Sequence, residues 1–208
     1  MALKGLEPGK RAALLVVEMQ NGIINPAFTA GPLVDQVEAR AIVPKINSLA
    51  AEFRAHGYPV VHCIISARPG FAGWNNNCYL AHHILRENRL ISGSVYAALH
   101  DGIDFQPEDY IEERHHGMSA FTGTRLAPLL RAHRVDTVVL SGVSTNVALI
   151  GSAIEAVGLG YQALLAEDCS AGATAESHAM QIGMNLSAVA SVGRADEIIA
   201  ALKNQDGR

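Results

Sequence analysis

The sequence has few cysteines. Cys63, Cys78 and Cys169 are the three among 208 residues, and their odd number leaves one thiol without a partner in any disulfide pairing. They also share no spacing typical of a metal site. A disulfide framework and a cysteine-based metal centre are therefore not expected, and a reduced, cytoplasmic setting is the simplest interpretation.

Long apolar runs and an excess of positive charge are absent too. The longest apolar run is Ala12–Val17, whereas a membrane-spanning helix needs about 20 apolar residues. Lys4, Lys10 and Arg11 interrupt the first twenty residues, so these lack the apolar core of a signal peptide. The formal net charge of −4 argues against a basic, phosphate-binding surface. We therefore expect neither a membrane nor a nucleic acid as partner.

The sequence does contain an alternation of strand and helix patterns. Unbroken apolar runs rich in branched residues indicate strands covered on both faces, and apolar positions at a spacing near 3.6 indicate amphipathic helices. We predict strands at residues 12–18, 59–65, 136–143 and 161–168, with a short strand before the last helix. The predicted helices are residues 33–56, with a bend at Pro44, then 145–158, 173–189 and 195–203.

This order predicts an α/β fold, a single domain over residues 1–208. Parallel neighbours need crossover helices, so we expect a parallel sheet of about six strands with helices on both faces. Ligands of such sheets bind beyond the carboxyl ends of the strands. Residues 18–21, 67–77, 142–146 and 168–172 should therefore border one cleft.

The stretch at residues 66–77 is long and irregular, which is typical of a binding loop and also of a surface excursion. Trp74 and Asn75 lie in it and are candidate walls of the cleft, together with Phe28 and Phe121.

No P-loop, GxGxxG, HExxH or CxxC motif is present, so nucleotide and zinc-protease sites have no support. The adjacent histidines at 82–83 and 115–116 are poor chelating pairs, because neighbouring side chains point in different directions. We expect no metal and no cofactor.

A serine motif leaves another possibility open. The sequence GVSTN at residues 142–146 resembles the GxSxG nucleophile elbow, with asparagine in place of the last glycine. Asp168 and His178 then follow in the chain order of a Ser–Asp–His triad with Ser144. The other interpretation is that Ser144 or Thr145 caps the helix that follows.

Four segments carry a resemblance to a known family. ALLVVEMQNG at residues 13–22 resembles the LLVIDMQND opening of the isochorismatase-like, or cysteine hydrolase, superfamily. HHGMSAFTGTRL at 115–126 is similar to its K-x-x-x-SAF-x-GT-x-L segment, and VVLSGVSTNVA at 138–148 to its VLxGVxTNxC segment. GY at 160–161 and DCSAG at 168–172 resemble its GY…DAxAG tail. The sequence is identified as a divergent member that lacks the catalytic cysteine and lysine.

The resemblance implies hydrolysis of amide-like C–N bonds, which the family performs with an aspartate, a lysine and a cysteine through an acyl-enzyme. It places Glu18 at the aspartate position and Ala148 at the cysteine position. The lysine position falls on His115, or on Arg114 or His116 if the match slips by one residue. Ala148 has no nucleophilic atom, so a thioester cannot form there. Isochorismatases proper have glycine at this position and hydrolyse a vinyl ether without a covalent intermediate.

Our first hypothesis is a hydrolase of a small organic molecule that forms no covalent cysteine intermediate. Glu18 would act as general acid or base, His115 as its partner, and the backbone amides near Val147 and Ala148 as an anion site. The second is a catalytically inactive member that binds a ligand or serves as a partner subunit. The remaining alternatives use Ser144, or Cys169 as a relocated thiol, as nucleophile.

The residues expected to contact the substrate flank these positions along the chain. They are Gln20, Phe28, Trp74, Asn75, Phe121, Thr145, Asn146 and Val147. Members of this superfamily usually associate, so the resemblance also implies a homodimer or a homotetramer.

Overall fold

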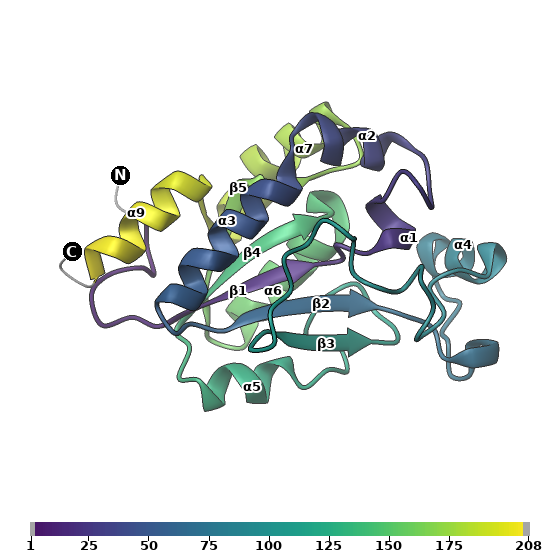
Figure 1. Ribbon diagram of the computed structural model, residues 1–208, viewed down its shortest axis with the longest axis horizontal. Coiled ribbons are helices and arrows are strands. Elements are labelled where there is room, and N and C mark those ends of the chain that lie inside the picture. Colours follow the sequence, from purple (N-terminus) through teal and green to yellow (C-terminus); the bar gives the residue numbers. More distant parts are fainter. Residues whose placement is uncertain (1–2, 206–208) are drawn as a thin grey trace.

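The computed structural model describes residues 3–205, and its centre is a six-stranded sheet (Figure 1). The strands lie in the order β3-β2-β1-β4-β5-β6, and all neighbours pair in parallel. The predicted α/β fold is confirmed. The strands are β1 Ala12–Val17, β2 Val60–Ile65, β3 Tyr110–Arg114, β4 Thr137–Val143, β5 Gln162–Ala171 and β6 Ser191–Gly193.

Helices connect the strands and cover both faces of the sheet. The α-helices are α1 Asn21–Ile24, α2 Pro32–Ala39, α3 Ile42–Ala55, α4 Tyr79–Glu87, α5 Leu126–Ala132, α6 Ile150–Gly158, α7 Ala175–Met180, α8 Ser187–Val189 and α9 Ala195–Gln205. A short 3₁₀ helix, η1, spans Pro69–Phe71, and two π-helical turns, η2 and η3, span Thr145–Leu149 and Gln181–Leu186. Within residues 3–205, no helix combines the length and the apolar character needed to cross a membrane.

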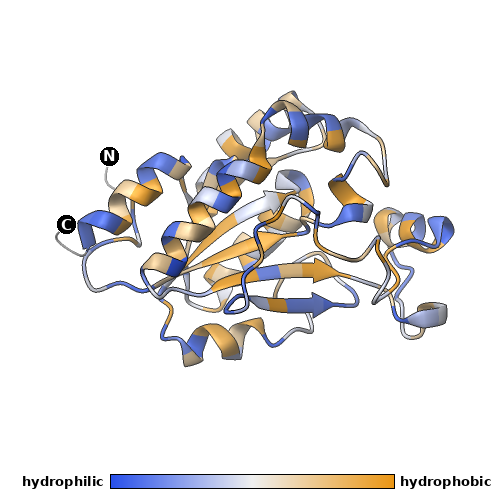
Figure 2. Ribbon diagram, in the orientation of Figure 1, coloured by the Kyte–Doolittle hydropathy of each residue, from blue (hydrophilic) through white to orange (hydrophobic). Residues whose placement is uncertain are grey.

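Strand β1 shows why the central strands read as unbroken apolar runs. Leu14 and Val16 pack on the side of α3 and α9, whereas Leu15 and Val17 pack on the side of α5 and α6. All four side chains are at most 1% exposed. Because successive side chains alternate between two covered faces, every position is apolar. Figure 2 shows these strands as a largely hydrophobic layer between the helices.

The predicted helix at residues 33–56 is in fact two helices, α2 and α3. Ala41 has a φ of +49°, in the left-handed region, and this ends the helical path between them. Arg40, beside the break, reaches to β5 and pairs with Glu167 at 2.5 Å. The bend is thus at Ala41 and not at Pro44, which lies in the first turn of α3, where a missing N–H is tolerated.

Strand β3 was not predicted from the sequence because it is not an apolar run. It lies at one edge of the sheet, where a strand need not be covered on both faces. Ile111 is 44% exposed, whereas Glu112 and Arg114 are 5% and 1% exposed. The buried positions of this strand therefore carry charges, which inverts the pattern that identifies a strand in a sequence.

Candidate active site

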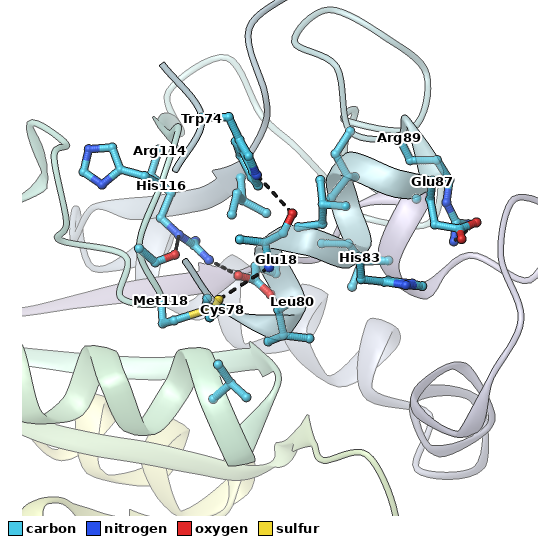
Figure 3. Close-up of a pocket in the computed structure, with 18 of the residues that line it drawn as sticks. Glu18, Trp74, Cys78, Leu80, His83, Glu87, Arg89, Arg114, His116 and Met118 are labelled. Carbon is cyan, nitrogen blue, oxygen red and sulfur yellow. Dashed lines mark hydrogen bonds and ion pairs between the residues drawn. The ribbon is translucent and has the colours of Figure 1, made fainter. Parts of the chain in front are cut away.

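A cavity of about 570 Å³ lies at the carboxyl ends of β1, β2, β3 and β4. Parallel sheets bind ligands at this edge, and small-molecule sites span about 300–1,000 Å³. Helix α4 and the loop before it contribute much of the wall (Figure 3). The lining residues include Glu18, Trp74, Asn75, Cys78, Leu80, His83, Ile84, Arg114, His116, Met118, Ser144 and Val147.

Glu18 follows β1 directly and has an unusual backbone conformation. Its φ of +53° lies in the left-handed region, which residues other than glycine seldom adopt. Its N–H donates to the carbonyl oxygen of Cys63, the β2 residue beside it, at 2.9 Å. The side chain lines the cavity and is 16% exposed. A residue held in this region costs about 1–3 kcal/mol, and such residues cluster at functional sites.

Arg114, the last residue of β3, forms an ion pair with Glu18. Its Nη2 donates to Oε1 of Glu18, and its Nε donates to the carbonyl oxygen of Gly117 at 3.3 Å. The Arg114 side chain is 1% exposed, and its Nη1 has no hydrogen-bond partner among residues 3–205. The cavity therefore contains a carboxylate held by a buried guanidinium, which we name the Glu18–Arg114 pair.

His115, the preferred partner of Glu18 in the sequence analysis, lies elsewhere. Its Nδ1 is 3.0 Å from the carbonyl oxygen of Ser66, and it is not among the described residues that line the cavity. His115 directly follows Arg114, the last residue of β3, so a shift of one position in the sequence match exchanges one residue for the other. The partner of Glu18 in the structure is therefore Arg114, the one-residue alternative, and His116 lies on the cavity wall.

Ala148 lies in the turn that follows β4. Ser144 and Val147 of this turn line the cavity, whereas Ala148 is 1% exposed and packs into the core. The N–H groups of Val147 and Leu149 donate to the carbonyl oxygen of Ser144 at 3.1 and 3.0 Å. The amide of Val147 is thus already engaged, which differs from its expected role in an anion site. π-helical turns of this kind are rare in proteins, and those that occur are often found at functional sites.

Three of the predicted substrate contacts line the cavity: Trp74, Asn75 and Val147. Trp74 is fixed to α4, because its Nε1 donates to the carbonyl oxygen of Ala81 at 3.0 Å (Figure 3). Thr145 and Asn146 instead fasten the turn to neighbouring segments. Thr145 Oγ1 lies 3.4 Å from Nδ1 of His178, and Asn146 Oδ1 accepts from the backbone at residue 173.

Gln20, Phe28 and Phe121 are not among the described residues that line this cavity, and each packs against other parts of the protein. Gln20 is fully buried, and its amide bonds the backbone N–H and carbonyl of Ile65 at 2.8 and 2.9 Å. The ring of Phe28 packs edge-on against Tyr96. Phe121 is 6% exposed and stacks on an aromatic ring at residue 161. Position in the sequence near the cleft was therefore not enough to place these side chains in it.

The predicted serine triad is not assembled. His178 contacts Glu167 at 3.1 Å and Thr145, and not Ser144. Asp168 accepts from the backbone N–H of Ala195 at 2.8 Å. Glu167 and Asp168 are successive residues of β5, so their side chains point to opposite faces and only Glu167 reaches His178.

The relocated-thiol alternative, Cys169, is not among the described residues that line the cavity. Cys169 is fully buried, and burial raises the pKa of its thiol to about 12. A thiol in this state is not a nucleophile near neutral pH.

Helix α4 supplies residues that the sequence analysis missed, among them Leu80, His83 and Ile84. Cys78, at its N-terminus, accepts a hydrogen bond from the backbone N–H of Ala81. The spacing of Leu80 and Ile84 by four residues was a signal that could have revealed the helix. Over the described range, residues 3–205, no group of three or more His, Cys, Asp or Glu side chains is arranged to hold a metal ion.

Comparisons with known proteins identify relatives of this chain. A family model described as the isochorismatase domain matches residues 12–197. The uncharacterized isochorismatase family protein YecD of Escherichia coli O157:H7 is 33% identical over 196 residues, which cover 93% of this chain and 97% of that protein. A maleamate amidohydrolase of Pseudomonas putida is 28% identical over 172 residues, 82% of this chain and 76% of that protein. The structure of a cysteine hydrolase from Pseudomonas syringae superposes with a TM-score of 0.82 at 21% identity, over 99% of this chain and 96% of that one.

Proposed function

The chain belongs to the isochorismatase family, whose members are hydrolases of small molecules, and we propose that it is an active hydrolase that works through the Glu18–Arg114 pair. One observation carries this proposal. A carboxylate and a buried guanidinium meet on the wall of a cavity of about 570 Å³, at the edge of the sheet where such folds bind ligands. A side chain with a strained backbone and a buried charged partner is costly, which favours a role beyond packing.

Glu18 is the proton-transfer group in this proposal. Its carboxyl group gives a proton to the leaving atom of the substrate, or takes one from the attacking water. Arg114 holds Oε1 of Glu18 and fixes the direction in which the carboxyl group points. Its permanent charge also stabilises negative charge that develops on a substrate oxygen. Arg114 thus takes the role that the sequence analysis gave to His115.

Water is the nucleophile, and no covalent bond forms at residue 148. The methyl group of Ala148 cannot attack a carbonyl carbon, and it is packed in the core. We propose that the enzyme needs no cofactor, because Glu18, Arg114 and water supply both the proton transfer and the nucleophile. The relationship to a maleamate amidohydrolase makes small amides the first substrates to test.

The test is a screen of small amides, esters and enol ethers for hydrolysis, with products measured by mass spectrometry. Replacing Glu18 by glutamine should lower the rate by about 10²–10⁴-fold, the usual contribution of a general acid or base. Glu18→Asp should retain part of the activity. The matched control is Glu108→Gln, which removes an exposed carboxylate and should leave the rate unchanged. Equal activity of Glu18→Gln and the wild type would refute the role of Glu18. Binding without turnover, measured by a thermal shift, would support the ligand-binding alternative instead.

We also propose that the chain forms a homodimer or homotetramer. Ile154 and Val157 on α6 are 56% and 46% exposed, and Met184 on η3 is 70% exposed. Helix α6 and η3 are in contact, so these exposed apolar side chains are carried by neighbouring elements. Light scattering after gel filtration measures the mass of the assembly, and the mass of one chain would contradict the proposal.

A further inference from the structure

A thiol that the proposed hydrolysis does not use lies in the same cavity. Cys78 is exposed and lines the cavity together with Glu18 and Arg114, and Figure 3 shows its side chain directed to the same part of the cavity. Cys63 and Cys169 are 1% and 0% exposed, and burial raises the pKa of each thiol to about 12. Cys78 is thus the cysteine that a ligand in the cavity can reach.

Cys78 lies at a helix N-terminus, where backbone N–H groups point toward its sulfur. It is the N-cap residue of α4, a helix of nine residues, and its Sγ accepts from the N–H of Ala81 at 3.5 Å. The first N–H groups of a helix have no partner within the helix, and the helix dipole is positive at this end. Both features favour an anionic group of a ligand beside Cys78.

A second, independent observation points to a ligand with an anionic oxygen. Arg114 is 1% exposed, yet its Nη1 has no hydrogen-bond partner within residues 3–205. Buried donors are nearly always paired, and a carboxylate is the group that best fits a guanidinium. The acidic residues of the cavity are already engaged: Glu18 pairs with Arg114, and Glu87 pairs with Arg86 at 3.1 Å and with Arg89 at 3.8 Å.

The remaining wall is largely apolar. Trp74, Leu80, Ile84, Leu90 and Met118 all line the cavity. These side chains suit a ligand with an apolar body, since most of a bound small molecule is covered by such groups. The cavity therefore combines an apolar wall, a guanidinium with an unused donor, and a thiol at a helix N-terminus.

We propose that Cys78 is a covalent binding site for small carboxylic acids that carry an electrophilic carbon, such as α,β-unsaturated acids. The carboxylate pairs with Arg114, and Sγ of Cys78 attacks the electrophilic carbon. With an unsaturated acid, a bond forms from Sγ to the β-carbon, and the C=C π electron pair moves to the α-carbon. The α-carbon takes up one proton, which replaces the proton that the thiol released to water. This site does not depend on hydrolysis, although its occupant would lie beside Glu18.

The test compares iodoacetate with iodoacetamide, which share the reactive carbon and differ in the carboxylate. In both reactions an S–C bond forms at Cys78, the C–I bond breaks, and iodide leaves with the electron pair. Rate constants for labelling are measured by mass spectrometry on the native protein and on the same chain in urea. We expect the ratio of iodoacetate to iodoacetamide rates at Cys78 to be about tenfold higher in the native protein than in urea. Cys63 and Cys169 should remain unlabelled until the chain unfolds.

Substitutions at Arg114 test the contact with the carboxylate. Arg114→Met should abolish the preference for iodoacetate, Arg114→Lys should retain part of it, and Cys78→Ser should abolish labelling of the native protein. Equal rate ratios in the native and unfolded wild type would overturn the proposal even if the Arg114 variants failed to fold. An unchanged preference in folded Arg114→Met would overturn it as well. Neither result bears on the hydrolase, which the Glu18 variants test separately.

Discussion

Replacing Arg114 by methionine removes one partner of the Glu18–Arg114 pair and keeps a long, unbranched side chain. The Arg114 side chain is 1% exposed and that of Glu18 is 16% exposed, so the carboxylate left behind keeps some contact with water in the cavity. Breaking a buried ion pair from one side costs about 3–5 kcal/mol. Because Glu18 stays partly hydrated, we expect the free energy of unfolding to fall by about 3 kcal/mol, the lower end of that range.

Urea unfolding followed by circular dichroism measures this loss. With a slope of about 2 kcal/mol per molar urea, the midpoint should move down by about 1.5 M. The double variant Glu18→Gln/Arg114→Met leaves neither charge unpaired, so it should lose less stability than the sum of the two single variants. An interaction energy of about 1–3 kcal/mol is expected for residues in direct contact.

The matched control is Arg125→Met, which makes the same substitution in another Arg–Glu pair. Arg125 lies 3.5 Å from Glu112, but its side chain is 85% exposed. Pairs of this kind contribute about 0–1 kcal/mol. Two results would contradict this inference of a buried ion pair. One is that Arg114→Met shifts the midpoint no further than Arg125→Met. The other is that the losses of stability in the Glu18 and Arg114 single variants simply add up in the double variant.

Two further predictions concern stability. Gly142→Ala should lower the free energy of unfolding by about 3 kcal/mol or more, because φ at Gly142 is +95° and the new Cβ would lie 2.2 Å from a carbonyl oxygen of β1. The control is Gly158→Ala, where the new Cβ meets open space. Equal Tm values for the two variants would contradict this reasoning. Burial raises the pKa of the Asp109 carboxyl, but hydrogen bonds from His62 and Arg54 outweigh it, so the pKa lies below its usual value. The charged form is then favoured in the folded state, so stability should fall as the pH drops below about 4, the usual value for aspartate. Urea unfolding at pH 5 and pH 3 measures this effect, and between these pH values the wild type should lose more stability than Asp109→Asn. Equal losses would exclude Asp109 as the source of the pH dependence.

Local pattern was sufficient for the central strands. The predictions at 12–18, 59–65 and 136–143 differ by only one residue at either end from β1, β2 and β4, because strands covered on both faces are apolar at every position. The predicted strand at 161–168 is β5, which continues to Ala171. The same criterion failed for the edge strand β3, whose buried positions are Glu112 and Arg114.

The candidate site was predictable to the extent that its residues follow strands. Glu18 and the loop residues Trp74 and Asn75, which were predicted to border the cleft, line the cavity, because carboxyl ends of parallel strands meet at one edge. The contact between Glu18 and Arg114 could not be predicted, since Arg114 and His115 are neighbours in the chain and only their tertiary contacts distinguish them. From the sequence, Cys78 was only one of three cysteines without a metal-site spacing.

The sequence by itself determined the layers of this protein, the family to which it belongs, and the absence of a nucleophilic side chain at Ala148, since each of these depends on residue type and spacing along the chain. Only the tertiary structure decided which side chains meet in the cavity. The choice of Arg114 over His115, and the arrival of Cys78 from α4 beside Glu18, depend on strand register and on the packing of segments far apart in the chain. Both depend on which face of a strand or helix carries a side chain, and a shift of one residue in strand register moves that side chain to the opposite face.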